Sequence, residues 1–150
     1  MNISDLIEPE RVILDLRVRD KTHLLRELSQ RVAPAVGVDP NAIFAALQAR
    51  ESLGSTGVGR GFALPHARID GLQHLYGMFA RLNRPMEFQA IDEHPVDLVF
   101  LLLIPQNAGQ EHVGALAAIA RRFRDETTVQ QIRKAADADA AYRLLTAVTA

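Results

Sequence analysis

Seven consecutive apolar residues, 98–104, form the longest such run in this 150-residue chain and constrain its fold more than any other segment. Asp97 closes the run on one side and Pro105 closes it on the other. The run is far shorter than the roughly 20 residues that a membrane-spanning helix needs. A short run that is apolar at every position is typical of a strand covered on both faces. We therefore expect a central strand between two layers of helices.

A first amphipathic helix is predicted early in the chain. Asp20 is a suitable N-cap, and Pro34 lies near the expected end of the helix. The apolar positions between them recur at helical spacing, at Leu24, Leu28 and Val32.

A second helix is predicted immediately afterwards. Asp39-Pro40 combines an N-cap with a proline at the first helical position, which is a strong start signal. The helix is expected to end before Gly54, which leaves Arg50 in its last turn. Its expected buried residues are Ile43, Phe44 and Leu47.

Shorter patterns predict the remaining elements. We expect strands over 12–16 and 75–82, an extended piece over 62–64, and short helices over 128–135 and 138–148. A further helix follows the central strand, with apolar positions at Val113, Leu116, Ile119 (or Ala120) and Phe123. Strands that alternate with helices indicate an α/β fold with a central sheet. At 150 residues we expect a single domain over 1–150, with its core at about 3–148.

Composition argues against several classes of function. Lys plus Arg number 17 and Asp plus Glu number 18, so the chain lacks the basic excess of a nucleic-acid binder. It has no cysteine, which excludes disulfides and thiolate metal sites. Residues 1–8 show neither the basic nor the apolar part of a secretion signal, and together with the lack of cysteine this favours a cytoplasmic protein without a membrane span.

A glycine-rich loop follows the second predicted helix, with glycines at Gly54, Gly57, Gly59 and Gly61. Such a loop can turn successive N–H groups toward an anion, although a loop that merely turns is equally consistent with this composition. The GxxxxGK[ST] pattern fails because Arg60-Gly61 follows Gly59. The GxGxxG fingerprint fails in spacing, and it follows a strand whereas this loop follows a helix. A nucleotide site is therefore not expected.

His66 is the candidate reactive residue. It stands directly after Pro65, where the extended piece ends, and an imidazole with a pKa of about 6.5 is largely neutral and nucleophilic near pH 7. A turn histidine without a chemical role is the alternative. The preceding segment offers groups that suit phosphate oxygens, namely Arg50, Ser55, Thr56, the N–H groups around Gly57, and Arg60. Each also has a purely structural explanation, as a helix-end charge, a turn former or a solvated side chain.

His112 is a second candidate because it opens the helix that follows the central strand. Loops beyond the carboxyl ends of strands form the usual ligand crevice of open α/β sheets, and helix N-termini favour anions. A residue that merely begins the helix is equally consistent with the spacing.

No HExxH or comparable metal-ligand spacing is present. The other histidines, His23, His74 and His94, are expected at the surface. The arginine cluster Arg121, Arg122 and Arg124 is expected on a solvated helix face, and partner docking is the alternative role for this cluster.

Short sequence motifs that match a known protein family are spread over nearly the whole chain. The most specific is Arg50-Glu51-Ser52, Gly54-Ser55-Thr56-Gly57 and Ala63-Leu64-Pro65-His66. The others are Ile3-Ser4-Asp5-Leu6, Pro9-Glu10-Arg11-Val12, Phe88-Gln89-Ala90-Ile91-Asp92, Pro95-Val96-Asp97-Leu98-Val99-Phe100, Leu103-Ile104-Pro105 and Glu111-His112. Together these blocks resemble the enzyme IIA domain of the mannitol/fructose type in the bacterial phosphotransferase system, most closely its nitrogen-regulatory branch.

This resemblance implies a mixed sheet flanked by helices and an enzyme that transfers phosphoryl groups through a phosphohistidine. It places the phosphorylated residue at His66, with Nε2 the favoured nitrogen, the supporting arginine at Arg50 and a second active-site histidine at His112. The implied donor is a histidine-containing phosphocarrier protein, and no metal or other cofactor is implied. The chain departs from the family at Arg60, where His or Asn is common, and at Phe62, where an aliphatic residue is common. Arg60 either strengthens phosphate binding or alters partner docking.

Three functions follow from these features. The first is a phosphoryl carrier with a nitrogen-type regulatory role, or a IIA component that feeds a sugar permease. The second is a regulatory module whose docking to transporters or sensor kinases is switched by phosphorylation. The third is an anion-binding domain that carries out no transfer.

Overall fold

Strand β6, Val96–Pro105, is the central strand of a six-stranded sheet in the computed structural model, which describes residues 2–147. The predicted run 98–104 lies inside it. Its side chains alternate between two cores, with Val99, Leu101 and Leu103 in one and Leu98, Phe100 and Leu102 in the other. All six side chains are completely buried. The prediction of a strand covered on both faces is therefore confirmed.

The sheet is mixed, as expected. Its strand order is β1-β5-β6-β3-β2, and β4 also pairs with β6. The flanking strands are β1 (Val12–Leu16), β2 (Gly57–Gly59), β3 (Phe62–Ala63), β4 (His66–Ile69) and β5 (Tyr76–Met86). Strand β5 runs antiparallel to β6, whereas β3 and β4 run parallel to it.

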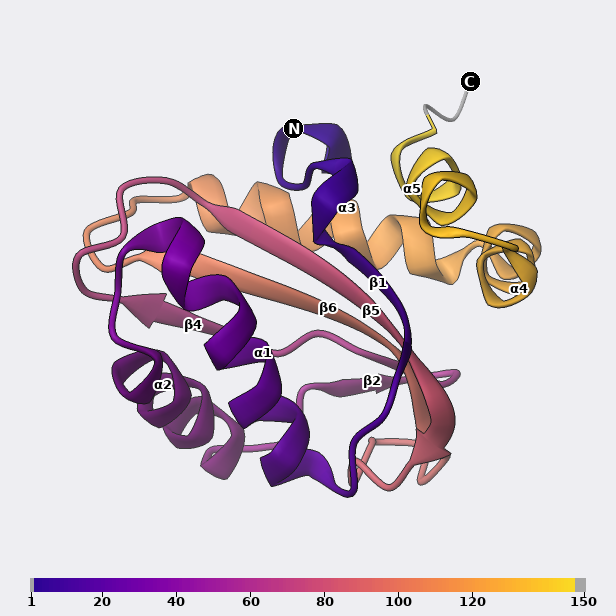
Figure 1. Ribbon diagram of the computed structural model, residues 1–150, viewed down its shortest axis with the longest axis horizontal. Helices are drawn as coiled ribbons and strands as arrows, with labels where there is room; N and C mark the ends of the chain where they lie inside the picture. Colours follow the sequence, from indigo (N-terminus) through magenta and orange to yellow (C-terminus); the bar gives the residue numbers. More distant parts are fainter. Residues whose placement is uncertain (1, 148–150) are drawn as a thin grey trace.

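Helices cover both faces of the sheet (Figure 1). Helices α1 (Lys21–Val36) and α2 (Pro40–Ser52) pack on one face. The other face carries α3 (Glu111–Arg124), α4 (Glu126–Lys134) and α5 (Ala138–Thr146), with the 3₁₀ turn η1 (Ile3–Asp5) among them. A second 3₁₀ turn, η2 (Pro9–Arg11), leads into β1. Neither turn was predicted. Within residues 2–147 no helix is long and apolar enough to cross a bilayer.

Both predicted helix starts are confirmed by their capping contacts. The side chain of Asp20 accepts a hydrogen bond from the backbone N–H of His23, and that of Asp39 accepts one from Asn41. Helix α2 ends before Gly54 and holds Arg50 in its last turn. The end of α2 therefore lies where the glycine-rich loop begins.

Three of the predicted apolar helix positions are not fully buried, and Leu116 of α3 is one of them, with its side chain partly buried. Phe44 is only partly buried, at the edge of the core, and the guanidinium of Arg26 covers its ring at 4.0 Å from the ring centre. Val113 is 52% exposed, because the buried stripe of α3 begins two residues later, at Ala115.

Several element bounds differ from the predictions. The glycine-rich loop contains β2, which forms an antiparallel pair with β3, so this segment is a hairpin and not a plain loop. Strand β5 continues to Met86. Helix α4 starts earlier than predicted because Asp125 caps it. Helix α5 ends at Thr146, and the predicted end at Val148 lies outside the described residues.

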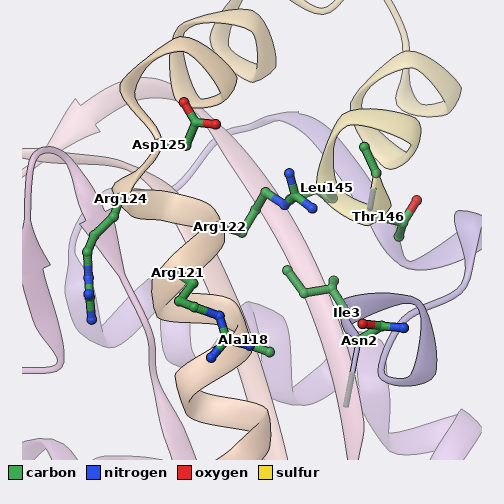
Figure 2. Close-up of a pocket in the computed structure, with 10 residues that line it drawn as sticks. Asn2, Ile3, Ala118, Arg121, Arg122, Arg124, Asp125, Leu145 and Thr146 are labelled. Atoms are coloured by element: carbon green, nitrogen blue, oxygen red, sulfur yellow. The ribbon is translucent and has the colours of Figure 1, made fainter. Parts of the chain in front are cut away.

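The arginine cluster of α3 borders a pocket of about 450 Å³ between η1 and the C-terminal ends of α3 and α5 (Figure 2). Arg122 extends from α3 toward Leu145, whereas Arg124 points away from α5. The pocket lies at the opposite end of α3 from His112, roughly 14 Å along the helix. None of the predicted phosphate-site residues lines it.

Replacing Phe100 by alanine should lower the free energy of unfolding by about 3–5 kcal/mol, because it leaves a cavity in the fully buried central strand. Urea denaturation followed by circular dichroism measures the change. The control Leu53→Ala removes a side chain that is 84% exposed and should change the value by less than about 0.5 kcal/mol. Equal losses in the two variants would contradict this account of the core.

Candidate functional site

His66 is the first residue of β4, whereas the sequence suggested that it ends an extended segment. It pairs in register with Leu102 of β6. Ala67 and Ile69 are buried in the core beneath α1 and α2. Because side chains alternate along a strand, His66 and Arg68 point to the other face, on which α3 lies.

The ring of His66 is held by its own chain. Its Nδ1 lies 2.8 Å from the carbonyl oxygen of Leu64. A carbonyl only accepts hydrogen bonds, so Nδ1 carries the proton in the neutral ring and Nε2 keeps its lone pair. The partly buried side chain therefore presents Nε2 as its nucleophilic atom.

Burial lowers the pKa of His66 below its ordinary value of 6.5. The hydrogen bond to Leu64 opposes this shift, as does the negative charge of Glu51, whereas the charges of Arg50 and His112 favour it. The net direction keeps the imidazole neutral at pH 7. Three predicted site residues, Arg50, His66 and His112, are thus close enough to interact electrostatically.

Arg50 reaches the site from the last turn of α2. Its Nη1 donates to the carbonyl oxygen of Gly54 at 2.9 Å, which fastens the helix end to the start of the glycine-rich loop. Its other guanidinium N–H groups make no hydrogen bond within residues 2–147. A forked cation beside a nucleophilic nitrogen suits the binding of phosphoryl oxygens.

His112 lies in the first turn of α3. Its Nδ1 is 3.1 Å from the carbonyl oxygen of Gly109, so Nδ1 donates and Nε2 faces away from this bond. The side chain is partly exposed. The end of α2 and the start of α3 therefore approach His66 from opposite faces of the sheet.

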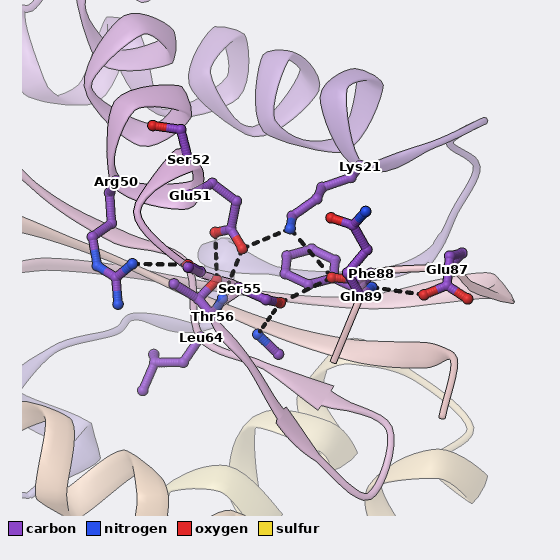
Figure 3. A network of polar contacts seen from close by, with 12 residues as sticks. Lys21, Arg50, Glu51, Ser52, Ser55, Thr56, Leu64, Glu87, Phe88 and Gln89 are labelled. Carbon is purple, nitrogen blue, oxygen red and sulfur yellow. Dashed lines mark hydrogen bonds and ion pairs between the residues drawn. The ribbon is translucent and has the colours of Figure 1, made fainter. Parts of the chain in front are cut away.

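Glu51 anchors the loop through a network that the sequence did not predict (Figure 3). Its carboxylate accepts from the backbone N–H of Thr56 at 2.7 Å and from the Thr56 hydroxyl at 2.6 Å. Lys21 of α1 forms an ion pair with this carboxylate, with its Nζ 2.8 Å from Glu51 Oε1. The Glu51 side chain is only 6% exposed. The one sequence signal was its place in the Arg50-Glu51-Ser52 block.

Ser55, Thr56 and Gly57 make hydrogen bonds to neighbouring parts of the protein. The hydroxyl of Ser55 donates to the carbonyl of Phe88 at 2.9 Å and accepts from the N–H of Gly57 at 3.0 Å. A Cβ at position 57 would come within 2.8 Å of the Cβ of Ala90, so only glycine fits there. These residues shape the loop between Arg50 and His66 through hydrogen bonds to Glu51, to Phe88 and within the loop itself.

Arg60 lies at the other end of the hairpin. It turns the chain with a φ of 59°, and its Nη1 donates to the carbonyl of Arg124 at 3.3 Å. Along β6 the hairpin residue Phe62 pairs with Leu98 whereas His66 pairs with Leu102, roughly 13 Å further on. The structure therefore does not bring Arg60 to His66, and the arginine lies beside α3 and α4.

Comparison with known proteins identifies the family. The model of the family "Phosphoenolpyruvate-dependent sugar phosphotransferase system, EIIA 2" matches residues 5–148. The chain belongs to this family. It is thus a IIA component of the phosphotransferase system, in agreement with the blocks around Arg50 and His66.

Relatives of this EIIA 2 protein place it near the nitrogen-regulatory branch. It is 45% identical to the "Nitrogen regulatory protein" of Bradyrhizobium diazoefficiens over 145 residues, which cover 97% of this chain and 95% of that protein. The crystal structure of the nitrogen regulatory protein IIA-Ntr from Neisseria meningitidis superposes with a TM-score of 0.92 at 33% identity, covering 96% and 99% of the two chains. The Escherichia coli IIA mannitol structure shares the fold, with a TM-score of 0.79 at 19% identity over 93% and 98%.

The pKa of His66 should lie below 6.5 when its ring carbon protons are titrated by NMR. Because the unfolded chain then binds more protons between the folded pKa and 6.5, stability should fall as the pH drops through this window. His66→Gln removes this dependence and serves as the control in urea denaturation at pH 7.5 and pH 5. A titration midpoint at or above 6.5 would overturn the assignment.

Glu51→Gln should lower the free energy of unfolding by about 2 kcal/mol, because it leaves the ammonium of Lys21 unpaired in a largely buried site. Glu27→Gln is the matched control, since Glu27 pairs with Arg31 on an exposed helix face and should change stability by less than about 0.5 kcal/mol. Thermal or urea unfolding measures both. Similar values for the two variants would show that the Glu51 network adds little to stability.

Proposed function

We propose that His66 accepts a phosphoryl group from the phosphohistidine of a histidine-containing phosphocarrier protein. The observation that carries this proposal is the hydrogen bond from Nδ1 to the Leu64 carbonyl. It leaves Nε2 unprotonated beside Arg50 and His112, in a ring whose pKa is lowered by burial. A neutral nitrogen with a fixed direction is what in-line attack on phosphorus requires.

The transfer exchanges one phosphorus–nitrogen bond for another. The lone pair of His66 Nε2 attacks the phosphorus, and the bond to the donor imidazole breaks with its electron pair returning to the donor nitrogen. Positive charge then spreads over the His66 ring, where the Leu64 carbonyl stabilises the Nδ1–H. Arg50 binds phosphoryl oxygens, and His112, whose ring is oriented by the hydrogen bond from Nδ1 to the Gly109 carbonyl, helps to stabilise the transferred group.

We further propose that phosphorylation of His66 has a regulatory role. The relative at 45% identity is named a nitrogen regulatory protein, which supports a regulatory role here. Phosphorylation adds a charge of about −1.5 to −2 at His66, enough to change the docking of a transporter or sensor kinase at that surface. The family description also names sugar phosphotransfer, so onward transfer to a sugar permease component is the second candidate.

The proposal is tested by reconstituting the relay with phosphoenolpyruvate, the general first enzyme and the histidine carrier. Wild type should gain an acid-labile phosphoryl group, and His66→Ala should gain none. Arg50→Ala and His112→Ala should be phosphorylated roughly ten- to a hundred-fold more slowly, because each removes charge stabilisation at the transferred group. His94→Ala is the control and should react at the wild-type rate. An unlabelled wild type, or a labelled His66→Ala, would refute the proposal.

The regulatory role is tested by comparing the partners of His66→Ala, which cannot be phosphorylated, and His66→Asp, which adds a negative charge. A switch predicts that at least one transporter or kinase binds one variant and not the other. Identical partner sets, together with rapid transfer of phosphate from wild type to a IIB component, would favour sugar uptake.

A further inference from the structure

Arg68 lies beside the proposed site, although neither its sequence context nor the proposed transfer assigned it a role. It is two residues after His66 on β4 and therefore points to the same face of the sheet. Its side chain is exposed, so burial does not explain its position. Instead it spans from β4 to the linker between β6 and α3.

This linker is held by one guanidinium nitrogen. Arg68 Nη1 donates to the carbonyl oxygens of Ala108, Gln106 and Pro105, at 2.9, 3.1 and 3.4 Å. The backbone N–H of Gln106 also donates to the carbonyl of Ile69 at 3.2 Å. The linker is thus tied to β4, the strand that carries His66.

The first turn of α3 has few other anchors. Its N-cap residue, Gln110, makes no capping hydrogen bond through its side chain. Val113 is exposed, a Cβ on Gly114 would meet only open space, and the first buried residue of the helix is Ala115. The position of this turn therefore depends on the linker that precedes it.

His112 is bound to that linker. Its Nδ1 donates to the carbonyl of Gly109, the residue that follows Ala108. A continuous path of hydrogen bonds and one peptide bond therefore joins Arg68 to the His112 ring.

We infer that Arg68 is a positioning residue that fixes His112 relative to His66 by clamping the linker between β6 and α3. It acts through His112 and does not bind the transferred group itself. The inference rests on the proposed function, because it gives the clamp a role in phosphoryl transfer. Displacement of a catalytic group by about 1 Å can slow a reaction by up to a hundred-fold. Loss of the Arg68 contacts should therefore slow phosphoryl transfer measurably.

A double-mutant cycle tests this coupling. Arg68→Met keeps the apolar stem and removes the donors, and should slow phosphorylation of His66 about ten-fold. In a His112→Ala background the same change should cost less than about two-fold, because the group that Arg68 positions is gone. Arg68→Lys should recover part of the rate. Arg84→Met, an exposed strand arginine with no hydrogen bond or ion pair in the described part of the chain, should leave the rate unchanged. Additive effects of Arg68→Met and His112→Ala would overturn the inference.

Amide hydrogen exchange gives a readout that does not need phosphorylation. Arg68→Met should raise the exchange rates of the hydrogen-bonded amides of Gln106, Ala108 and Val113 at least five-fold and shift the ring signals of His112, whereas amides of β6 should stay protected. Unchanged exchange and unchanged His112 signals would overturn the clamp itself. If wild type accepts no phosphate but the exchange result holds, the proposed function fails and the structural role of Arg68 stands.

Discussion

The burial of residues 98–104 of β6 on both faces is the constraint from which the site follows. A strand segment that is apolar and buried at every position needs a layer of helices on each side, and the chain supplies α1 and α2 on one face and α3 to α5 on the other. Strand β4 pairs with the carboxyl end of β6. The last turn of α2 and the first turn of α3 therefore meet there from opposite faces, and each brings one charged or polar group to His66.

Two kinds of contact hold the segments around His66 in place. Buried polar contacts fix the glycine-rich segment, since Glu51 of α2 makes three short contacts, one with Lys21 of α1 and two with Thr56. Exposed contacts to backbone carbonyls fix the other side, where Arg68 holds the linker before α3. The first kind contributes chiefly to stability and the second chiefly to alignment, because an exposed hydrogen bond adds little net free energy yet still restricts geometry.

Features set by neighbouring residues were predictable from the sequence. The caps at Asp20 and Asp39 and the double-faced strand depend on local pattern, and the structure confirms them. Features set by distant packing were not predictable. The exposure of Val113 depends on where α3 first meets the sheet, and the position of Arg60 depends on a hairpin that carries it away from His66. The ion pair of Lys21 joins two helices whose sequences give no sign of the contact.

The hydrogen bond that orients His66 has an unusual consequence for variation. Its acceptor is the peptide carbonyl of Leu64, and every amino acid at that position supplies the same oxygen. No amino-acid substitution at position 64 can delete the acceptor, so the tautomer of the His66 ring is inherited with the backbone path itself. The surrounding side chains can change while the lone pair stays on the same nitrogen, Nε2 of His66.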